Sequence, residues 1–264
     1  MKLGFIGCGN MATAMIKGII RNGIVAKEDI MGADLSQASI DKIAGEMGIY
    51  VTTDNKEVAS NVDVLVLSVK PQFYESVIAE IKDVVKEQQL IITIAPGKTL
   101  AWLGEQFGKT VKIVRTMPNT PALVGEGITA ACSNENVTPE ELDTVTGILR
   151  GFGKCEVVPE HLMDVVTSVS GSSPAYVFMF IEAMADGAVA DGMPRAQAYE
   201  FAAQAVLGSA KMVLETGKHP GELKDMVCSP GGTTIEAVRV LEEKGMRSAV
   251  FEAVKACTRK SRCS

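Results

Sequence analysis

Short apolar runs alternate with amphipathic segments through the first half of the chain, and this alternation predicts strands and helices in turn. Strands are predicted at 3–6, 30–33, 62–69, 90–95 and 111–114, with later candidates at 128–132 and 154–158. Helices are predicted at 10–21, 36–47, from Asp54, at 72–86, around Trp102 and from Thr138. Repeated strand–helix units favour an α/β fold with a doubly wound, mostly parallel sheet.

Strand signals end at residue 158, and the rest of the chain is predicted to be helical. These helices are predicted at 164–190 with an interruption at 171–174, and at 195–215, 220–226, 233–244 and 248–260. The change of period divides the chain into a first domain, 1–158, and an all-helical second domain, 159–264. The alanine-rich helix 195–215 is expected to be buried between helices. A domain of ~105 residues has difficulty covering its apolar faces alone, so we expect dimerisation through it.

A glycine-rich turn connects the first predicted strand to the first predicted helix. Its sequence is Gly7-Cys8-Gly9-Asn10-Met11-Ala12. Gly7 permits a tight turn, Gly9 lets a pyrophosphate approach the backbone, and the small Ala12 lets helix and strand pack closely. Asp34 follows the second predicted strand about 25 residues after Gly9, near the offset at which an acidic residue meets the adenine ribose. The pattern predicts a Rossmann-like dinucleotide site.

The predicted strands of the first domain end in irregular segments. These segments are Gly7, Asp34, 68–71, 95–97 and 117–121. Because the carboxyl ends of parallel strands share one edge of the sheet, we expect these loops to form a cleft there.

Composition narrows the class of protein. The 264 residues carry a net charge of −6, which does not favour nucleic-acid binding. No charge-free apolar run is long enough to cross a membrane, and the N-terminus enters a strand without a signal-peptide pattern. The six cysteines include no C-x-x-C pair and no zinc-type spacing with histidine, so we expect reduced thiols, no metal and a cytoplasmic protein.

The candidate chemistry of the second domain lies at 228–236, Cys-Ser-Pro-Gly-Gly-Thr-Thr-Ile-Glu. Thr233 and Glu236 have the spacing of a capping box, which would place the two preceding glycines outside a helix N-terminus and Thr234 on its first turn. Free backbone N–H groups there suit a carboxylate, and the Thr234 hydroxyl is left for a ligand. A plain helix cap with a flexible entrance is the alternative interpretation.

The scarcity of histidine bears on the reaction. The two histidines are His161, at the domain junction, and His219, which precedes Pro220 and suits a helix cap. An alcohol dehydrogenase needs a base for the hydroxyl proton, and Lys70 is the best candidate, although its position suits cofactor contact equally. Reduction of a C=N bond needs only orientation, a hydride and a hydrogen-bonding hydroxyl.

These motifs together resemble the pyrroline-5-carboxylate reductase family over essentially the whole chain. The matching stretches are Gly-Phe-Ile-Gly-Cys-Gly-Asn-Met (4–11), Val-Lys-Pro-Gln (69–72), Arg-Thr-Met-Pro-Asn-Thr-Pro-Ala-Leu-Val (115–124), Ser-Val-Ser-Gly-Ser-Ser-Pro-Ala-Tyr (168–176) and His-Pro-Gly-Glu-Leu-Lys-Asp-Met-Val-Cys-Ser-Pro-Gly-Gly-Thr-Thr-Ile-Glu-Ala (219–237). The resemblance implies reduction of 1-pyrroline-5-carboxylate to L-proline by NADPH or NADH, the last step of proline biosynthesis. It also implies a homodimer through the helical domain, often assembled into a decamer.

The resemblance assigns roles by position. Thr234 would hydrogen-bond the ring nitrogen as the catalytic residue, and the substrate would be bound by Asn119, Gly231, Gly232, Thr233 and Thr234. The cofactor would contact Gly7, Cys8, Gly9, Asn10, Met11, Ala12, Asp34, Asn55, Ser68, Val69, Lys70, Pro71, Ala95 and Gly97. The choice between the two nicotinamides stays open, because the family leans to NADPH whereas a carboxylate at Asp34 favours NADH.

Two rival functions remain. Another two-domain NAD(P)-dependent reductase of small acids, such as a β-hydroxyacid dehydrogenase, would need a lysine on the first long helix of the second domain, and 164–190 contains none. A dinucleotide-sensing protein without catalysis would keep the glycine loop but would not need Thr234 and its neighbouring glycines.

Overall fold

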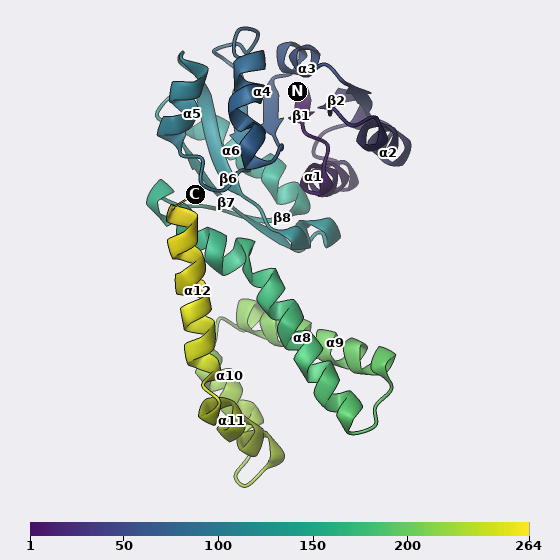
Figure 1. The fold of residues 1–264 in the computed structure, drawn as a ribbon, viewed down its shortest axis with the longest axis vertical. Helices are drawn as coiled ribbons and strands as arrows, with labels where there is room; N and C mark the ends of the chain where they lie inside the picture. Colours follow the sequence, from purple (N-terminus) through teal and green to yellow (C-terminus); the bar gives the residue numbers. More distant parts are fainter. Residues whose placement is uncertain (264) are drawn as a thin grey trace. The chain divides into compact units, whose positions relative to one another are not determined.

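A computed structural model describes residues 1–263 of the chain. The chain forms two compact units (Figure 1). The first comprises residues 1–172 together with the end of the chain from Cys257 onward, and the second comprises Ser173–Ala256. The domain boundary expected from the change of period lies earlier, between residues 158 and 159, and stays a prediction.

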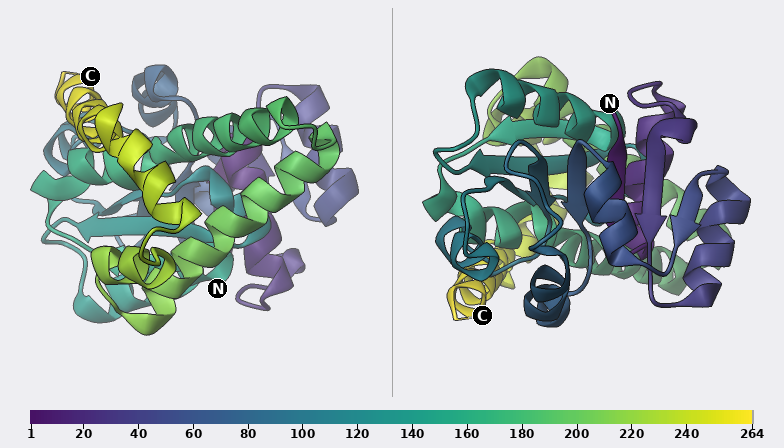
Figure 2. Two further views of the ribbon diagram at one scale, coloured as in Figure 1. Left: turned by 90° about the horizontal axis from the view of Figure 1, so that it is seen from below. Right: turned by 90° about the horizontal axis from the view of Figure 1, so that it is seen from above.

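The first unit contains an eight-stranded sheet in the order β3-β2-β1-β4-β5-β6-β7-β8. The view from above in Figure 2 shows strands of this sheet with helices on both sides. Its strands are β1 (Leu3–Ile6), β2 (Ile30–Ala33), β3 (Tyr50–Thr52), β4 (Val64–Leu67), β5 (Leu90–Thr93), β6 (Lys112–Met117), β7 (Gly127–Ser133) and β8 (Gly153–Val157). Neighbouring strands are parallel except β6 and β7, which are antiparallel. The predicted α/β class with a mostly parallel Rossmann-like sheet is therefore confirmed.

The helices of the first unit cover both faces of this sheet. They are α1 (Asn10–Arg21), α2 (Gln37–Met47), α3 (Asn55–Asn61), α4 (Tyr74–Ile81), α5 (Leu100–Phe107), α6 (Pro139–Leu149) and α7 (Met163–Val166). Side chains of α1, α2 and α6 pack in one apolar cluster, and those of α3, α4 and α5 pack in the other. Strand β4 contributes side chains to both clusters: Val64 and Val66 lie in the first, and Leu65 and Leu67 lie in the second. This burial on both faces explains its continuous apolar sequence.

The register of the parallel strands brings their carboxyl ends to one edge. Ile6 at the end of β1 is paired with Ala33 of β2 and with Leu67 of β4, and Leu67 is paired with Thr93 of β5. The segments that follow these strands therefore begin at the same edge of the sheet, as predicted.

Several predicted bounds differ from the structure. The edge strand β3 was not predicted, because its three residues are exposed or half-buried and show no apolar run. The helix predicted at 72–86 is shorter: a 3₁₀ turn, Pro71–Phe73, precedes α4, and α4 ends at Ile81. The predicted interruption at 171–174 is a π turn at Thr167–Gly171 followed by Ser172. Pro174 stands instead in the first turn of a long helix.

The second unit is helical. It contains α8 (Ser173–Ala190), α9 (Arg195–Thr216), α10 (Pro220–Val227), α11 (Thr233–Glu243) and most of α12 (Met246–Arg262). Of residues 173–256, only Ala185, Ala198 and Ala202 are buried in the single chain. In the single chain, helix α9 packs against α8 and buries only Ala198 and Ala202, so its expected burial between helices stays a prediction.

Candidate active site

The glycine loop of the first unit has the geometry of a pyrophosphate cradle. Gly7 has φ +93°, and a Cβ there would lie 2.8 Å from the Val69 side chain, so the turn requires glycine. Gly9 is the extended N-cap of α1, and a Cβ there would meet no atom of residues 1–263 within 4 Å. Packing therefore does not demand glycine at this position, whereas close approach of a ligand does.

Helix α1 begins directly after Gly9, which is its N-cap. Within residues 1–263 no side chain caps the helix. The first N–H groups and the helix dipole are thus left for an anion. Ala12 is fully buried against the sheet, as the third small position of the motif requires. The loop therefore fits the phosphates of a nicotinamide dinucleotide.

Asp34 and Cys8 join the glycine loop to the end of β2. The Cys8 N–H donates to one Asp34 carboxylate oxygen (2.7 Å), and the Ser36 N–H donates to the other (2.8 Å). The Cys8 thiol is buried and donates to the Ala33 carbonyl. Burial, with a smaller contribution from the Asp34 charge, raises the pKa of this thiol to about 12. It stays protonated at neutral pH, so Cys8 shapes the loop and is not a nucleophile.

The segments after β4 and β5 lie along the same edge. The Ser68 hydroxyl contacts the carbonyl oxygens of Ile6 (3.1 Å) and Gly7 (2.7 Å), so it ties the end of β4 to the glycine loop. Lys70 is exposed. Ala95 is buried, and Gly97 has φ +75°, which a side chain would strain.

Tyr74 is a residue of this edge that sequence reasoning missed. Its hydroxyl donates to the Leu67 carbonyl and accepts the Ile94 N–H (3.2 Å), so it joins the ends of β4 and β5. Burial raises the pKa of this phenol well above its ordinary value, so it remains a neutral donor. The only sequence signal was an aromatic residue at the start of a helix that follows a strand end.

Asn55 and Asn119 are both engaged by the protein itself. Asn55 is buried and its amide donates to the Glu80 carboxylate (2.9 Å). The Asn119 amide donates to the Ser170 carbonyl (3.1 Å), and its oxygen accepts the Ile128 N–H (2.9 Å). Asn119 therefore holds the loop after β6 against the π turn, which sequence reasoning did not foresee.

The N-terminus of α11 carries the candidate substrate residues, and here one prediction is wrong. Thr233 is the first residue of α11 and not its cap: the N-cap is Gly232, in an extended conformation and without a side-chain cap. The Glu236 carboxylate accepts from Arg239 instead of returning to the cap (2.7 Å). Without a capping box, the N–H groups of the first turn are freer for an anion than predicted.

Thr234 lies on the first turn of this uncapped helix. It is half-buried, and its hydroxyl has no hydrogen-bond partner among residues 1–263. Gly231 has φ +67°, and a Cβ there would meet no atom of residues 1–263 within 4 Å, whereas a Cβ at Gly232 would clash with the Ser229 hydroxyl. The backbone is therefore open to a ligand at Gly231 and packed against Ser229 at Gly232. The N-terminus of α11 thus combines backbone N–H groups that can bind an anion with the neighbouring Thr234 hydroxyl, which has no hydrogen-bond partner among residues 1–263.

The histidines do not offer a general base in either half. His219 is the N-cap of α10, and its Nδ1 accepts the Gly221 N–H (3.0 Å), which confirms the predicted cap. His161 is exposed in a 3₁₀ turn after β8. Throughout residues 1–263, no three His, Cys, Asp or Glu side chains are grouped to hold a metal ion.

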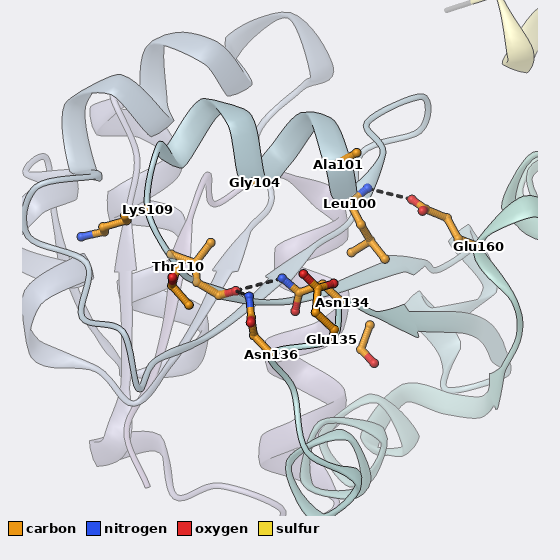
Figure 3. A pocket seen from close by; sticks show the side chains of 11 residues that line it. Leu100, Ala101, Gly104, Lys109, Thr110, Asn134, Glu135, Asn136 and Glu160 are labelled. Atoms are coloured by element: carbon orange, nitrogen blue, oxygen red, sulfur yellow. Dashed lines mark hydrogen bonds between the residues drawn. The ribbon is translucent and has the colours of Figure 1, made fainter.

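A polar concavity of about 620 Å³ lies elsewhere in the first unit (Figure 3). It includes none of the predicted site residues. The amides of Asn134 and Asn136 both donate to the Val111 carbonyl, and Glu160 accepts the Leu100 N–H, so these groups are engaged by the protein. We assign no ligand to it.

Family models match both halves of the chain. The one described as "NADP oxidoreductase coenzyme F420-dependent" matches residues 2–97, and the one described as "Pyrroline-5-carboxylate reductase dimerisation" matches residues 160–263. A Rossmann-like sheet with a glycine cradle, followed by a helical dimerisation segment, defines the class as a two-domain NAD(P)-dependent oxidoreductase.

Full-length relatives fix the family. The chain is 54% identical over 260 residues to pyrroline-5-carboxylate reductase of Escherichia coli (strain K12), covering 98% of this chain and 97% of the relative. It is 46% identical to the one from Methanosarcina acetivorans, covering 96% and 94%. The chain belongs to the pyrroline-5-carboxylate reductase family.

Solved structures agree with this assignment. A pyrroline-5-carboxylate reductase from Coxiella burnetii is similar with a TM-score of 0.92 and 36% identity, covering 99% of this chain and 97% of that one. A pyrroline carboxylate reductase from Plasmodium falciparum, solved with NADP bound, has a TM-score of 0.91 and 35% identity, covering 100% and 97%.

Proposed function

We propose that this chain reduces the C=N bond of 1-pyrroline-5-carboxylate to give L-proline, the last step of proline biosynthesis. A nicotinamide, as NADPH or NADH, supplies the hydride when bound. The hydride adds to the imine carbon while the ring nitrogen keeps a proton. Since that nitrogen can arrive protonated, the chain must supply orientation and one hydrogen bond, and not a general base.

The uncapped N-terminus of α11 is the observation that carries this proposal. The N–H groups of Gly231 and Thr233 are proposed to hold the substrate carboxylate, which the positive end of the helix dipole favours. The Gly232 N–H donates to the Ser229 carbonyl (3.0 Å), so we propose that Gly232 contributes the close backbone approach. The Thr234 hydroxyl is proposed to hydrogen-bond the ring nitrogen, because it is the free polar group beside that anion site. An acid and a nitrogen in one small ring match this pair of contacts.

The first unit is proposed to bind the dinucleotide and to orient it, without taking part in proton transfer. The first turn of α1, Asn10–Ala12, binds the pyrophosphate beside Gly9, and Asp34 meets the adenine ribose. The segment Ser68–Pro71 and residues Ala95 and Gly97 carry the nicotinamide side of the dinucleotide. Asn55 and Asn119 are proposed to take part through their remaining hydrogen-bonding capacity, since the Asn55 side chain has one partner in the protein and the Asn119 side chain has two.

The assembly and location follow from the same family. The chain is a homo-oligomer acting on a small molecule, and we propose that its unit is a dimer through the helical segment, assembled further into a decamer. No helix among the described residues is long and apolar enough to cross a membrane. We propose a cytoplasmic location.

The test follows the absorbance of reduced nicotinamide with the purified chain. Pyrroline-5-carboxylate, a set of small hydroxy or keto acids and buffer are supplied in turn with NADPH or NADH. We expect oxidation of the nicotinamide with the cyclic imine alone, with proline as the product. Turnover of the open-chain acids alone would favour another reductase of this build, and dinucleotide binding without any turnover would favour a sensor.

A further inference from the structure

The end of β2 presents a carboxylate that the protein holds in place. Asp34 is half-buried, and each of its oxygens accepts one backbone N–H, from Cys8 in the glycine loop and from Ser36 at the start of α2. An ionised carboxylate can accept about four hydrogen bonds, so two positions remain for hydroxyl donors. Ser36 is committed as the N-cap of α2, where it accepts the Ser39 N–H.

The surroundings of Asp34 add negative charge. The next strand, β3, pairs with β2 through Ala33 and Thr52, and Asp54, two residues after Thr52, is the N-cap of α3. Residues 34–39 include no arginine or lysine, and Lys56, the first basic residue after β3, stands beside Asp54 and Glu57. The amide of Asn55, which could have donated to a phosphate, donates to Glu80.

We propose that Asp34 is a specificity-determining residue that makes this chain prefer NADH to NADPH. A carboxylate at the end of the second strand accepts the two ribose hydroxyls of NADH, whereas the 2′-phosphate of NADPH meets a fixed like charge. The relative from Plasmodium falciparum was solved with NADP bound. The inference rests on the proposed cofactor site but not on the identity of the substrate.

The anchoring of Asp34 is what makes the discrimination strong. A carboxylate on a free surface side chain can turn away from a phosphate, and solvent screens it. Here both oxygens are tied to backbone N–H groups, and rotation would leave the Cys8 and Ser36 donors without acceptors. A bound 2′-phosphate therefore cannot escape the repulsion without breaking the glycine loop's own contacts.

Direct binding tests the proposal without catalysis. The dissociation constants of NADH and NADPH are measured on the full chain by the fluorescence of the bound nicotinamide, and those of 5′-AMP and 2′,5′-ADP by calorimetry. We expect NADH to bind at least about tenfold more tightly than NADPH. Asp34→Ser, which removes the charge and adds a hydroxyl, is expected to reduce or reverse that ratio, mainly by tightening NADPH and 2′,5′-ADP.

Two further variants control for damage to the loop. Asp34→Asn removes the charge and keeps an acceptor for one of the two N–H groups, so the ratio should move in the same direction. Asp41→Asn removes the same charge from α2, where the carboxylate accepts from the Gln37 amide (2.8 Å), and should leave the ratio unchanged. Equal or tighter binding of NADPH by the unaltered chain, or an unchanged ratio in both Asp34 variants, would overturn the proposal. Loss of imine reduction with the binding ratio intact would instead count against the proposed function.

Discussion

At the scale of single residues, the structure separates side chains that the protein already uses from those left for a ligand. Ser68, Asn55 and Asn119 each hydrogen-bond a neighbouring part of the first unit. Thr234 differs, because its hydroxyl has no partner among residues 1–263 and lies on an uncapped helix turn. Because it makes no hydrogen bond within the described chain and lies beside free N–H groups, Thr234 is a better candidate for substrate contact than these three residues.

Replacement of Thr234 tests that assignment. Thr234→Ala should lower kcat by about 10²-fold, the effect of losing one hydrogen bond that strengthens in the transition state. The melting temperature should change little, since the hydroxyl makes no hydrogen bond within residues 1–263. Thr234→Ser keeps the hydroxyl and should restore most of the rate. Unaltered turnover in the alanine variant would remove this residue from the mechanism.

At the scale of elements, the sequence predicted what depends on local pattern and missed what depends on neighbours. The helix predicted from Thr138 does begin there, where Thr138 forms a capping box with Glu141 at N3, and Pro139 stands at N1. The same spacing at Thr233 and Glu236 forms no cap, because the backbone turns into the helix one residue earlier, at Gly232. The edge strand β3 was missed because its pairing with β2 stabilises it, and not its own sequence.

In the candidate site, too, the features set by local sequence could be predicted, and those set by neighbouring elements could not. The glycine cradle could be predicted, since Gly7 and Gly9 follow from turn geometry and ligand approach. The bonds of Asp34 to Cys8 and Ser36, and of Tyr74 to Leu67 and Ile94, could not. They join residues distant in sequence, or depend on how a helix meets a strand end, and no local pattern encodes those distances.

The two capping sequences form a matched pair for measurement. Thr138→Ala should lower the free energy of unfolding by about 1 kcal/mol, because the Glu141 N–H loses its acceptor. Thr233→Ala should change it by less than about 0.5 kcal/mol, since an N1 side chain does not cap the helix. Urea titrations of both variants beside the unaltered chain give the two values. An equal loss in both would show that Thr233 does cap α11 in solution.

At the scale of the whole molecule, the two units differ in how they are stabilised. The first has two large apolar clusters and one small one around its sheet. Residues 173–256 bury only three alanines, while Phe178, Met179, Phe201 and Leu214 are each more than 60% exposed in the single chain. So much exposed apolar side chain is characteristic of a surface that another protein copy covers. Residues 160–263 match a family model for dimerisation, which indicates that a second copy of this chain covers the surface.

A charge placed on this surface should therefore weaken the assembly. Phe201 on α9 is 67% exposed in one chain, and Phe201→Glu would force a carboxylate into an apolar interface, at a cost of several kcal/mol. Sedimentation velocity should show a shift to smaller species, and imine reduction should fall because the second unit loses its covering. Thr144→Glu adds the same charge at an exposed position of α6 in the first unit and should change neither. NADH binding, which depends on the first unit, should survive in Phe201→Glu and so distinguish failed assembly from general misfolding. If Phe201→Glu sediments like the unaltered chain, α9 does not lie at the interface, and another face of the second unit must be covered.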